Sequence, residues 1–217
     1  MRRVLLSCAA MMSAAMPSAQ AAQGDWLIRT RAVFVAPTER SSAVLPLAPG
    51  GSISVDGAFT AEIDVSYFFL PHFAIETAVG YPARFHLSGE GDLAVLGEVV
   101  RTDALASIWT LQFHPFPEAR LRPYVGVGAN WTRFVKERES DALLAAFGPT
   151  VVSIDQSYGI VFQAGADIAL TDRLFMNVDA RFLDVDTTGK AKSIGIVNAV
   201  DLKLDPFVFG IGFGARF

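Results

Sequence analysis

Residues 59–69, FTAEIDVSYFF, alternate apolar and polar side chains over their first nine positions. The odd-numbered residues are apolar or aromatic, and Thr60, Glu62, Asp64 and Ser66 lie between them. Successive side chains of a β-strand point to opposite faces, so this pattern predicts a strand with one apolar and one polar face. Pro71-His72 follows directly and indicates a tight turn.

The same period of two recurs along the chain, whereas a helical period does not. In 73–87 the pattern places Phe85 and Leu87 on the apolar face with Phe73, and Arg84 and His86 on the opposite face. Besides 59–69, the predicted strands are 26–36, 73–87, 103–113, 124–135, 157–170, 174–184 and 207–217. The sequence therefore predicts eight strands.

The connections between these strands alternate in length. Short ones lie at 70–72, 114–121 and 171–173, and long ones at 37–55, 88–102, 136–155 and 187–200. An even number of antiparallel strands with this alternation is typical of outer-membrane barrels, whose short turns face the periplasm. We predict an all-β fold, an eight-stranded antiparallel transmembrane up-and-down β-barrel with short periplasmic turns and longer extracellular loops.

The composition favours a membrane barrel. The 217 residues are 52% apolar and 18% charged, and the mean hydropathy is +0.37, yet no apolar run beyond residue 20 approaches the roughly 18 residues of a membrane helix. Period alone also allows a soluble barrel with its apolar face inward. Aromatic residues at predicted strand ends, including Trp26, Tyr67, Tyr124 and the terminal Phe217, favour the membrane because aromatic girdles mark its two interfaces.

The N-terminus predicts export. Arg2 and Arg3 precede an apolar stretch and the small-residue triplet 19–21, AQA, so residues 1–21 are predicted to be a cleaved signal peptide and 22–217 the barrel domain. Cleavage removes Cys8, the single cysteine, and both arginines, which leaves 196 residues with 16 basic and 22 acidic side chains. An exported acidic chain without cysteine excludes a disulfide scaffold and argues against nucleic acid as a partner.

Several blocks of sequence carry a family resemblance. They are GDWLIR at 24–29, DVSYF at 64–68, LQFH at 111–114, RPYVGVGANW at 122–131, QAGAD at 163–167, LDVDT at 183–187, LDP at 204–206 and the closing GARF at 214–217. In order and spacing they resemble the OmpW family of small outer-membrane barrels, which includes AlkL-type alkane-uptake proteins. The resemblance implies a barrel that helps small hydrophobic molecules cross the outer membrane of a Gram-negative bacterium, and some members resemble bacteriocin or phage receptors.

The predicted inward face is charged toward the periplasmic end. Nearly balanced charges in a narrow lumen are expected to pair, because unpaired buried charges are costly. The predicted lumen network is Arg29, Arg31, Glu62, Asp64, Glu76, Asp167, Asp179, Arg181 and Arg216.

Toward the extracellular end the inward residues become small or apolar. The predicted upper chamber is Val33, Ala78, Gly126, Gly128, Val161, Val208 and Gly210. An apolar solute that enters this chamber would lose its favourable burial on crossing the charges below, so sideways exit into the bilayer is the cheaper route. Pro82 and Pro206 each remove a ladder hydrogen bond and are the candidate positions for a lateral opening, although bulges without a transport role explain them equally well.

Other functions remain as alternatives. His86, Ser88, Glu90 and Asp92 lie together near a surface loop, but without a nucleophile motif we expect no enzyme activity. We also expect no cofactor and no metal site. A surface receptor or structural protein without a transport role is the alternative function. The expected partners are outer-membrane lipid, small hydrophobic solutes and the barrel-assembly machinery through Phe217, and a monomer is expected.

Loop 136–155 contains a helix signal. Ser140 is a suitable N-cap for a short helix over residues 141–147, which Gly148-Pro149 would end. Leu143, Leu144 and Phe147 would then share one face, which covers the mouth of the chamber, contacts a ligand or serves only to order the loop.

Overall fold

The structure, a computed structural model, describes residues 23–38, 40–193 and 196–217. The predicted signal peptide, residues 1–21, lies outside these ranges. Within the described part of the chain, no helix is long and apolar enough to cross a membrane.

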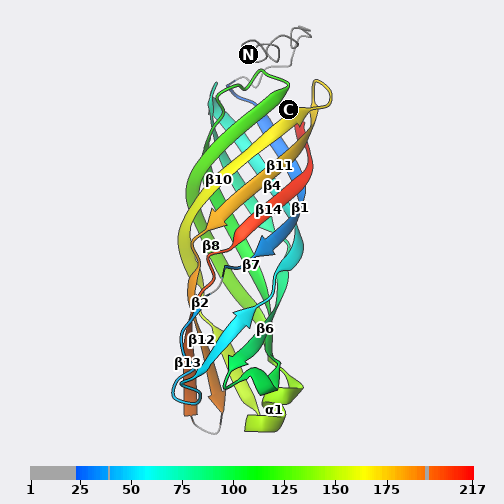
Figure 1. The fold of residues 1–217 in the computed structure, drawn as a ribbon. Helices are drawn as coiled ribbons and strands as arrows, with labels where there is room; N and C mark the ends of the chain where they lie inside the picture. The colour runs from blue at the N-terminus through cyan, green and yellow to red at the C-terminus, as the bar shows by residue number, and fades with distance from the viewer. Residues whose placement is uncertain (1–22, 39, 194–195) are drawn as a thin grey trace, which may run out of the picture.

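The chain forms a single closed antiparallel barrel whose wall has eight strands, as predicted (Figure 1). The sheet runs from β7 through β5, β4, β1, β14, β11 and β10 to β8, and pairing of β7 with β8 closes it. We count β5 and its continuation β6 as one wall strand. The eight wall strands are β1 (Trp26–Ala36), β4 (Ala58–Leu70), β5 (Phe73–Gly80) with β6 (Ala83–Gly91), β7 (Glu98–Phe113), β8 (Leu121–Glu139), β10 (Ser157–Ala169), β11 (Leu174–Leu183) and β14 (Phe207–Arg216).

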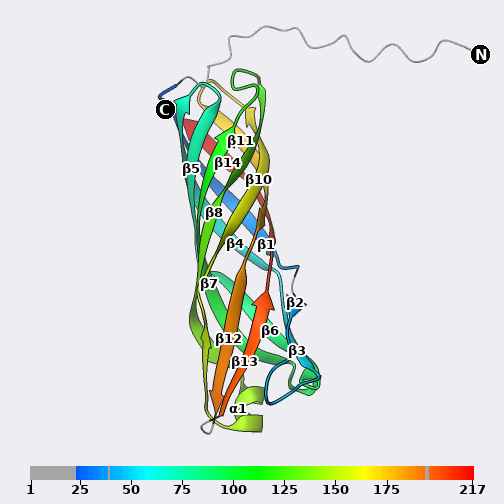
Figure 2. The ribbon, with the colours of Figure 1, turned by 90° about the vertical axis from the view of Figure 1, so that its left-hand side faces the viewer.

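The two ends of the barrel differ as the connection lengths predicted. The short turns and the C-terminus lie at one end, which we call the turn end, and the long segments lie at the other, the loop end (Figures 1 and 2). At the turn end two backbone hydrogen bonds join the chain termini of the barrel, from Trp26 N to Phe217 O at 3.0 Å and from Phe217 N to Trp26 O at 2.9 Å.

Three of the four segments predicted to be long loops contain further strands. β3 (Gly51–Val55) pairs with β6, and a second sheet runs in the order β2 (Arg40–Ser41), β13 (Ile196–Lys203), β12 (Asp186–Ser193) and β9 (Thr150–Ile154). The prediction missed β12 because its sequence, DTTGKAKS, has no apolar alternation. Figure 2 shows β12 and β13 extending the barrel wall at the loop end.

The short helices lie in the same region. A 3-10 helix spans Ala94–Leu96, and α1 spans Asp141–Phe147. The predicted cap of α1 is confirmed, because the Ser140 hydroxyl oxygen accepts a hydrogen bond from Leu143 N at 3.1 Å.

The predicted strand 73–87 is interrupted, and its facing changes at the interruption. In β5 the outward residues are Phe73, Ile75 and Val79, but in β6 Phe85 and Leu87 are buried inside the barrel while Arg84 is exposed outside. The prediction that Phe85 and Leu87 share the outer face with Phe73 is therefore wrong. Pro82 interrupts the strand pairing. Two residues, Tyr81 and Pro82, separate the inward-facing Gly80 and Ala83, where a regular strand has one, so the alternation is shifted by one position.

Candidate functional site

Three arginines and five carboxylates form one buried layer across the barrel lumen. Each of them is at most 7% exposed. This charged layer consists of Arg29, Arg31, Arg181, Glu62, Asp64, Glu76, Asp167 and Asp179. It unites eight of the nine predicted network residues. Arg216, the ninth, pairs with Asp25 at the turn end.

Arg29 contacts carboxylates from three wall strands. Its Nη1 atom lies 2.9 Å from Asp64 Oδ1, directly across the β1–β4 ladder, and 3.2 Å from Glu76 Oε2. Its Nη2 atom lies 2.9 Å from Asp167 Oδ2. The guanidinium also lies 5.6 Å from the Tyr124 ring centre, within cation–π range. Arg29 thus ties β4, β5 and β10 to β1.

Arg31 and Arg181 share three acids. Glu76 lies 3.5 Å from Arg31 Nη2 and 3.2 Å from Arg181 Nη2. Glu62 lies 3.1 Å from Arg31 Nε and 2.8 Å from Arg181 Nη1. Asp179 Oδ1 lies 3.3 Å from Arg31 Nη1 and 2.9 Å from Arg181 Nε. Because each of these shared acids contacts at least two cations, the layer is a network rather than a set of isolated pairs. With all groups ionised its three positive and five negative charges leave a net charge of −2.

Neutral polar residues that the prediction omitted complete the layer. Gln163 Nε2 donates to Glu76 Oε1 and to Asp179 Oδ2, each at 2.9 Å, and the Tyr124 hydroxyl donates to Asp179 Oδ2 at 2.9 Å. Tyr124 was predicted to lie in the aromatic girdle, which is wrong, since it is buried in the lumen. Gln112 and Asn177 also donate to the acids, and their inward parity within the predicted strands would have identified them.

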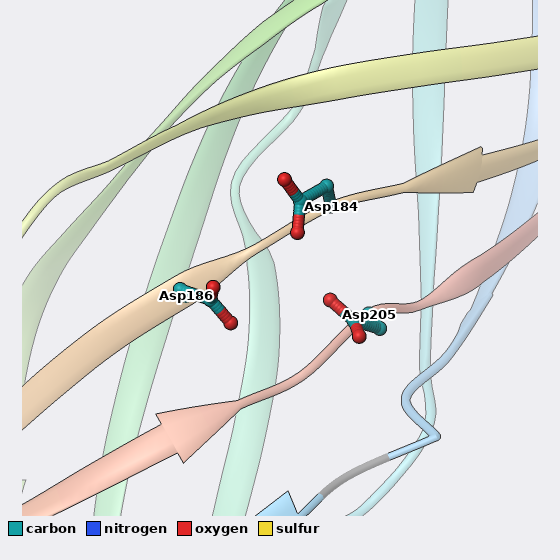
Figure 3. Close-up of side chains that lie close together, drawn as sticks. All are labelled: Asp184, Asp186 and Asp205. Atoms are coloured by element: carbon teal, nitrogen blue, oxygen red, sulfur yellow. The ribbon is translucent and has the colours of Figure 1, made fainter.

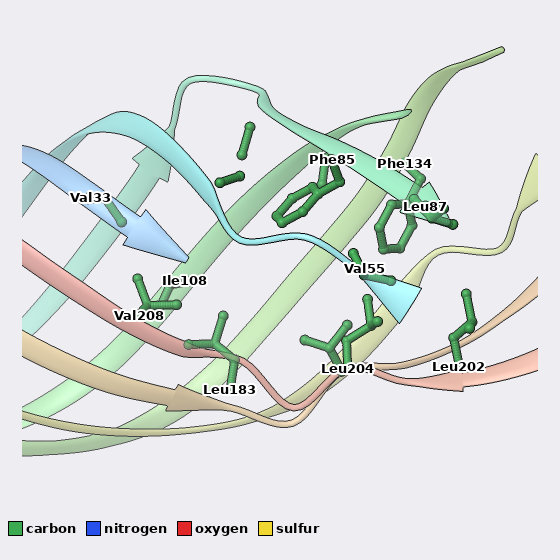
Figure 4. Packing of buried hydrophobic residues seen from close by; sticks show 14 of the residues in the cluster. Val33, Val55, Phe85, Leu87, Ile108, Phe134, Leu183, Leu202, Leu204 and Val208 are labelled. Atoms are coloured by element: carbon green, nitrogen blue, oxygen red, sulfur yellow. The ribbon is translucent and has the colours of Figure 1, made fainter. Parts of the chain in front are cut away.

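Apolar side chains fill the lumen on the loop side of the charged layer (Figure 4). A cavity of about 90 Å³ lies among them, and Glu62 is the single charged side chain of its described lining. We call it the inner cavity. Of the predicted chamber residues, Val33 and Val208 line it, and Ala78 and Val161 belong to the same buried cluster.

The three glycines of the predicted chamber lie elsewhere. A Cβ atom at Gly126 would lie 2.9 Å from Gln163 Oε1, and one at Gly210 would lie 3.2 Å from Arg31 Cδ, so both glycines lie beside the charged layer. A Cβ at Gly128 would overlap the backbone of Trp109. These glycines leave room for bulky polar side chains and for close approach of strands, instead of lining the inner cavity.

A larger apolar cavity, the outer cavity, lies nearer the loop end. It measures about 420 Å³, within the usual range of small-molecule sites. Leu143, Ala146 and Phe147 of α1 line one part of it. It shares its lining residues Leu87, Ile154 and Leu202 with the inner cavity, so the two are adjacent.

The barrel wall has a gap in strand pairing beside Pro82. Glu62 pairs with Gly80 on one side of it and Val55 with Leu87 on the other, in one unbroken register. Between these pairs, the structure forms no strand pairing between residues 57–60 and residues 82–85. We call this gap the window. Backbone hydrogen bonds from Tyr81 N to Ala61 O (2.7 Å) and from Asp56 N to His86 O (3.1 Å) mark its two ends.

The window adjoins the inner cavity. Thr60, Gly80, Tyr81 and Ala83 line that cavity, whereas the neighbouring Phe59 is 81% exposed on the outer surface. The thin wall at this point separates an apolar interior from an outer surface that changes along the window from the exposed aromatic side chains of Phe59 and Tyr81 to the exposed Arg84.

The wall beside Pro206 is bridged on both sides. Pro206 O accepts from Leu183 N at 3.1 Å, and Leu204 O accepts from Thr38 N at 2.9 Å. The two prolines singled out in the sequence therefore differ, because only Pro82 lies beside a gap in the ladder.

Comparison with known proteins agrees with this architecture. The OmpW family matches residues 22–217. The chain belongs to the OmpW family. It is 28% identical over 198 residues to outer membrane protein W of Vibrio cholerae, with 90% of this chain and 89% of that one covered. It is 30% identical over 166 residues to outer membrane protein AlkL of Ectopseudomonas oleovorans, with 76% and 68% covered.

A solved structure shares the fold closely. The crystal structure of OprG from Pseudomonas aeruginosa superposes with a TM-score of 0.86 at 25% identity, covering 92% of this chain and 99% of that one. The OmpW-family chain is thus an outer-membrane β-barrel of Gram-negative bacteria, with the turn end periplasmic and the loop end extracellular.

One acidic cluster lies outside the lumen of this OmpW-family barrel. Asp184, Asp186 and Asp205 come from the β11–β12 junction, the start of β12 and the segment before β14 (Figure 3). Lys203 Nζ lies 3.8, 3.2 and 3.5 Å from their respective carboxylates. The Asp186 hydrogen bond raises the pKa of Lys203. A cation of the chain itself therefore already contacts all three carboxylates and offsets part of their charge.

The side chains of His86, Ser88, Glu90 and Asp92 do not converge on one site. His86 Nδ1 lies 2.8 Å from Glu98 Oε2. Glu90 accepts a hydrogen bond from Ser52 Oγ, and Asp92 accepts one from Gly50 N. The backbone oxygen of Ser88 accepts a hydrogen bond from the Ser54 hydroxyl. Each polar residue is thus engaged with a different neighbour.

Proposed function

We propose that this OmpW-family barrel passes small hydrophobic molecules from the cell surface into the outer-membrane bilayer. The molecule enters the outer cavity, moves to the inner cavity and leaves sideways through the window. The observation that carries this proposal is the order of the compartments, with two adjoining apolar cavities that end at a charged layer.

The charged layer makes the straight path unfavourable. An apolar solute gains about 25 cal/mol for each Å² buried in the cavities. To continue toward the periplasm it would have to separate ion pairs such as Arg29 with Asp64 and leave buried charges without partners, which costs several kcal/mol. The lipid that meets the exposed Phe59 and Tyr81 beside the window offers the solute an apolar surrounding without that cost.

The window supports a sideways exit at Pro82. Opening a β-barrel wall normally requires breaking ladder hydrogen bonds, and here four consecutive residues on each side lack strand partners across the gap. At Pro206 an opening would have to break the bonds of Leu183 and Thr38 described above. We therefore place the exit at Pro82 and not at Pro206.

Cells that display this protein should take up apolar probes faster without becoming permeable to charged ones. The measurement compares uptake of an apolar fluorophore, N-phenyl-1-naphthylamine, and of a charged dye in Gram-negative cells with and without the barrel. We expect a several-fold gain for the apolar fluorophore and none for the charged dye, since burial of an ion in an apolar cavity is unfavourable. Equal gains for both probes would show an open pore and contradict the proposal.

A further inference from the structure

The outer cavity contains one buried polar group with an unused hydrogen-bond donor. Asn198, on β13, lines the cavity and is 8% exposed. Its Oδ1 atom accepts a hydrogen bond from Leu47 N at 3.1 Å. A backbone N–H can only donate, so this contact fixes the amide with its oxygen toward Leu47. The Nδ2 group, which has two donors, makes no hydrogen bond with any described residue and remains accessible from the cavity.

The other polar side chains of the described lining already have partners. The Thr150 hydroxyl donates to Gly148 O at 3.0 Å, and the Ser193 hydroxyl donates to Phe147 O at 2.5 Å. Lys190 Nζ pairs with Asp155 at 2.6 Å and its side chain is 46% exposed. Asn198 is therefore the buried side chain of this lining that retains donors for a guest molecule.

We propose that Asn198 selects, among the molecules that the barrel takes up, those that carry one neutral hydrogen-bond acceptor on an apolar body, such as ketones, esters or ethers. The proposal rests on the function proposed above and specifies its substrate class. When a guest fills the cavity and excludes water, a donor without a partner becomes unfavourable, and an acceptor on the guest would satisfy it. A pure hydrocarbon fills the same space but leaves Nδ2 unsatisfied, and a carboxylate would bring an ion into an apolar cavity.

The test compares two guests of equal chain length, 2-nonanone and nonane, as competitors of N-phenyl-1-naphthylamine bound to the full barrel in lipid nanodiscs. The readout is the ratio of the two displacement constants, in which partition into lipid cancels between variants. Asn198→Leu and Asn198→Asp should each lower the preference for the ketone about three- to tenfold, the range expected for one lost hydrogen bond. Asn198→Asp keeps an acceptor for Leu47 N, so it remains informative if Asn198→Leu fails to fold.

Ser193→Ala is the matched control, because its hydroxyl is already engaged with Phe147 and the ratio should stay at the wild-type value. If both guests displace the fluorophore and the ratio is the same in wild type and both Asn198 variants, Asn198 has no role in selection. If neither guest displaces it from wild type, the cavity does not bind apolar molecules, and the proposed function fails together with this inference.

Discussion

Replacing Arg29 by methionine should lower the free energy of unfolding by about 3–5 kcal/mol, the cost of removing one partner from a buried charge network. Arg29 contacts Asp64, Glu76 and Asp167, all of them buried. Methionine fills much of the same volume but leaves these acids with fewer cations. The layer then carries two positive and five negative charges, so the repulsion among the acids grows. Denaturant unfolding in detergent micelles, followed by tryptophan fluorescence, measures the change.

Two controls separate the network from the general loss of an arginine. Arg84 is a surface residue whose side chain is 69% exposed and pairs with Asp103, so Arg84→Met should cost at most about 1 kcal/mol. Asp167→Asn removes one of the excess negative charges and should cost clearly less than Arg29→Met. A cost for Arg29→Met as small as that for Arg84→Met would show that the charged layer contributes little to stability.

The sequence predicted the membrane half of the barrel well, and the reason is physical. Lipid requires an apolar outer face, and a narrow lumen accepts polar side chains, so alternation such as that of residues 59–69 has one stable orientation. The resulting fold class and the family were both confirmed. The inward charges from β1, β4, β5, β10 and β11 could then only meet in the lumen, as Arg29 and Asp64 do.

The same rule failed at the loop end because the surroundings change there. Beyond the membrane the outer face meets water, so the stable arrangement is reversed and resembles that of a soluble barrel, with Phe85 and Phe134 inside and Arg84 and Arg133 outside. An alternation that continues through Pro82 without this reversal predicts Phe85 and Leu87 on the wrong face. The reversal also explains why apolar cavities lie above a charged layer.

Heights within the lumen could not be derived from sequence position alone. Strands in such barrels are tilted by about 35–45°, so residues equally far from a short turn lie at different heights on different strands. The sequence pattern predicts Gly126 and Gly210 in the chamber, but they lie beside Gln163 and Arg31. The window could not be predicted from the sequence for a related reason. A gap in the pairing of two strands depends on the register of both strands.

Gly80→Phe should reduce uptake of an apolar fluorophore at least about tenfold, which corresponds to an added barrier of about 1.4 kcal/mol. Gly80 lines the inner cavity beside the window. A Cβ atom there would meet nothing closer than Ala61 O at 3.9 Å, so the position has room for a side chain and the variant should fold. The phenyl ring would occupy the space between the inner cavity and the window. Uptake of N-phenyl-1-naphthylamine by whole cells gives the rate, and the heat-dependent gel mobility of the barrel checks that it is folded.

Thr77→Phe is the matched control, because Thr77 lies on the same strand and its side chain is exposed on the lipid-facing side. It adds the same ring outside the barrel and should leave the uptake rate within about twofold of wild type, since solvent- or lipid-exposed substitutions away from special features have small effects. A second comparison tests the straight path. Asp64→Asn combined with Asp179→Asn weakens the charged layer without touching the window, so uptake should stay unchanged. A sharp rise in that double variant, with unaltered uptake in Gly80→Phe, would mean that solutes pass through the layer itself and that the window is not the exit.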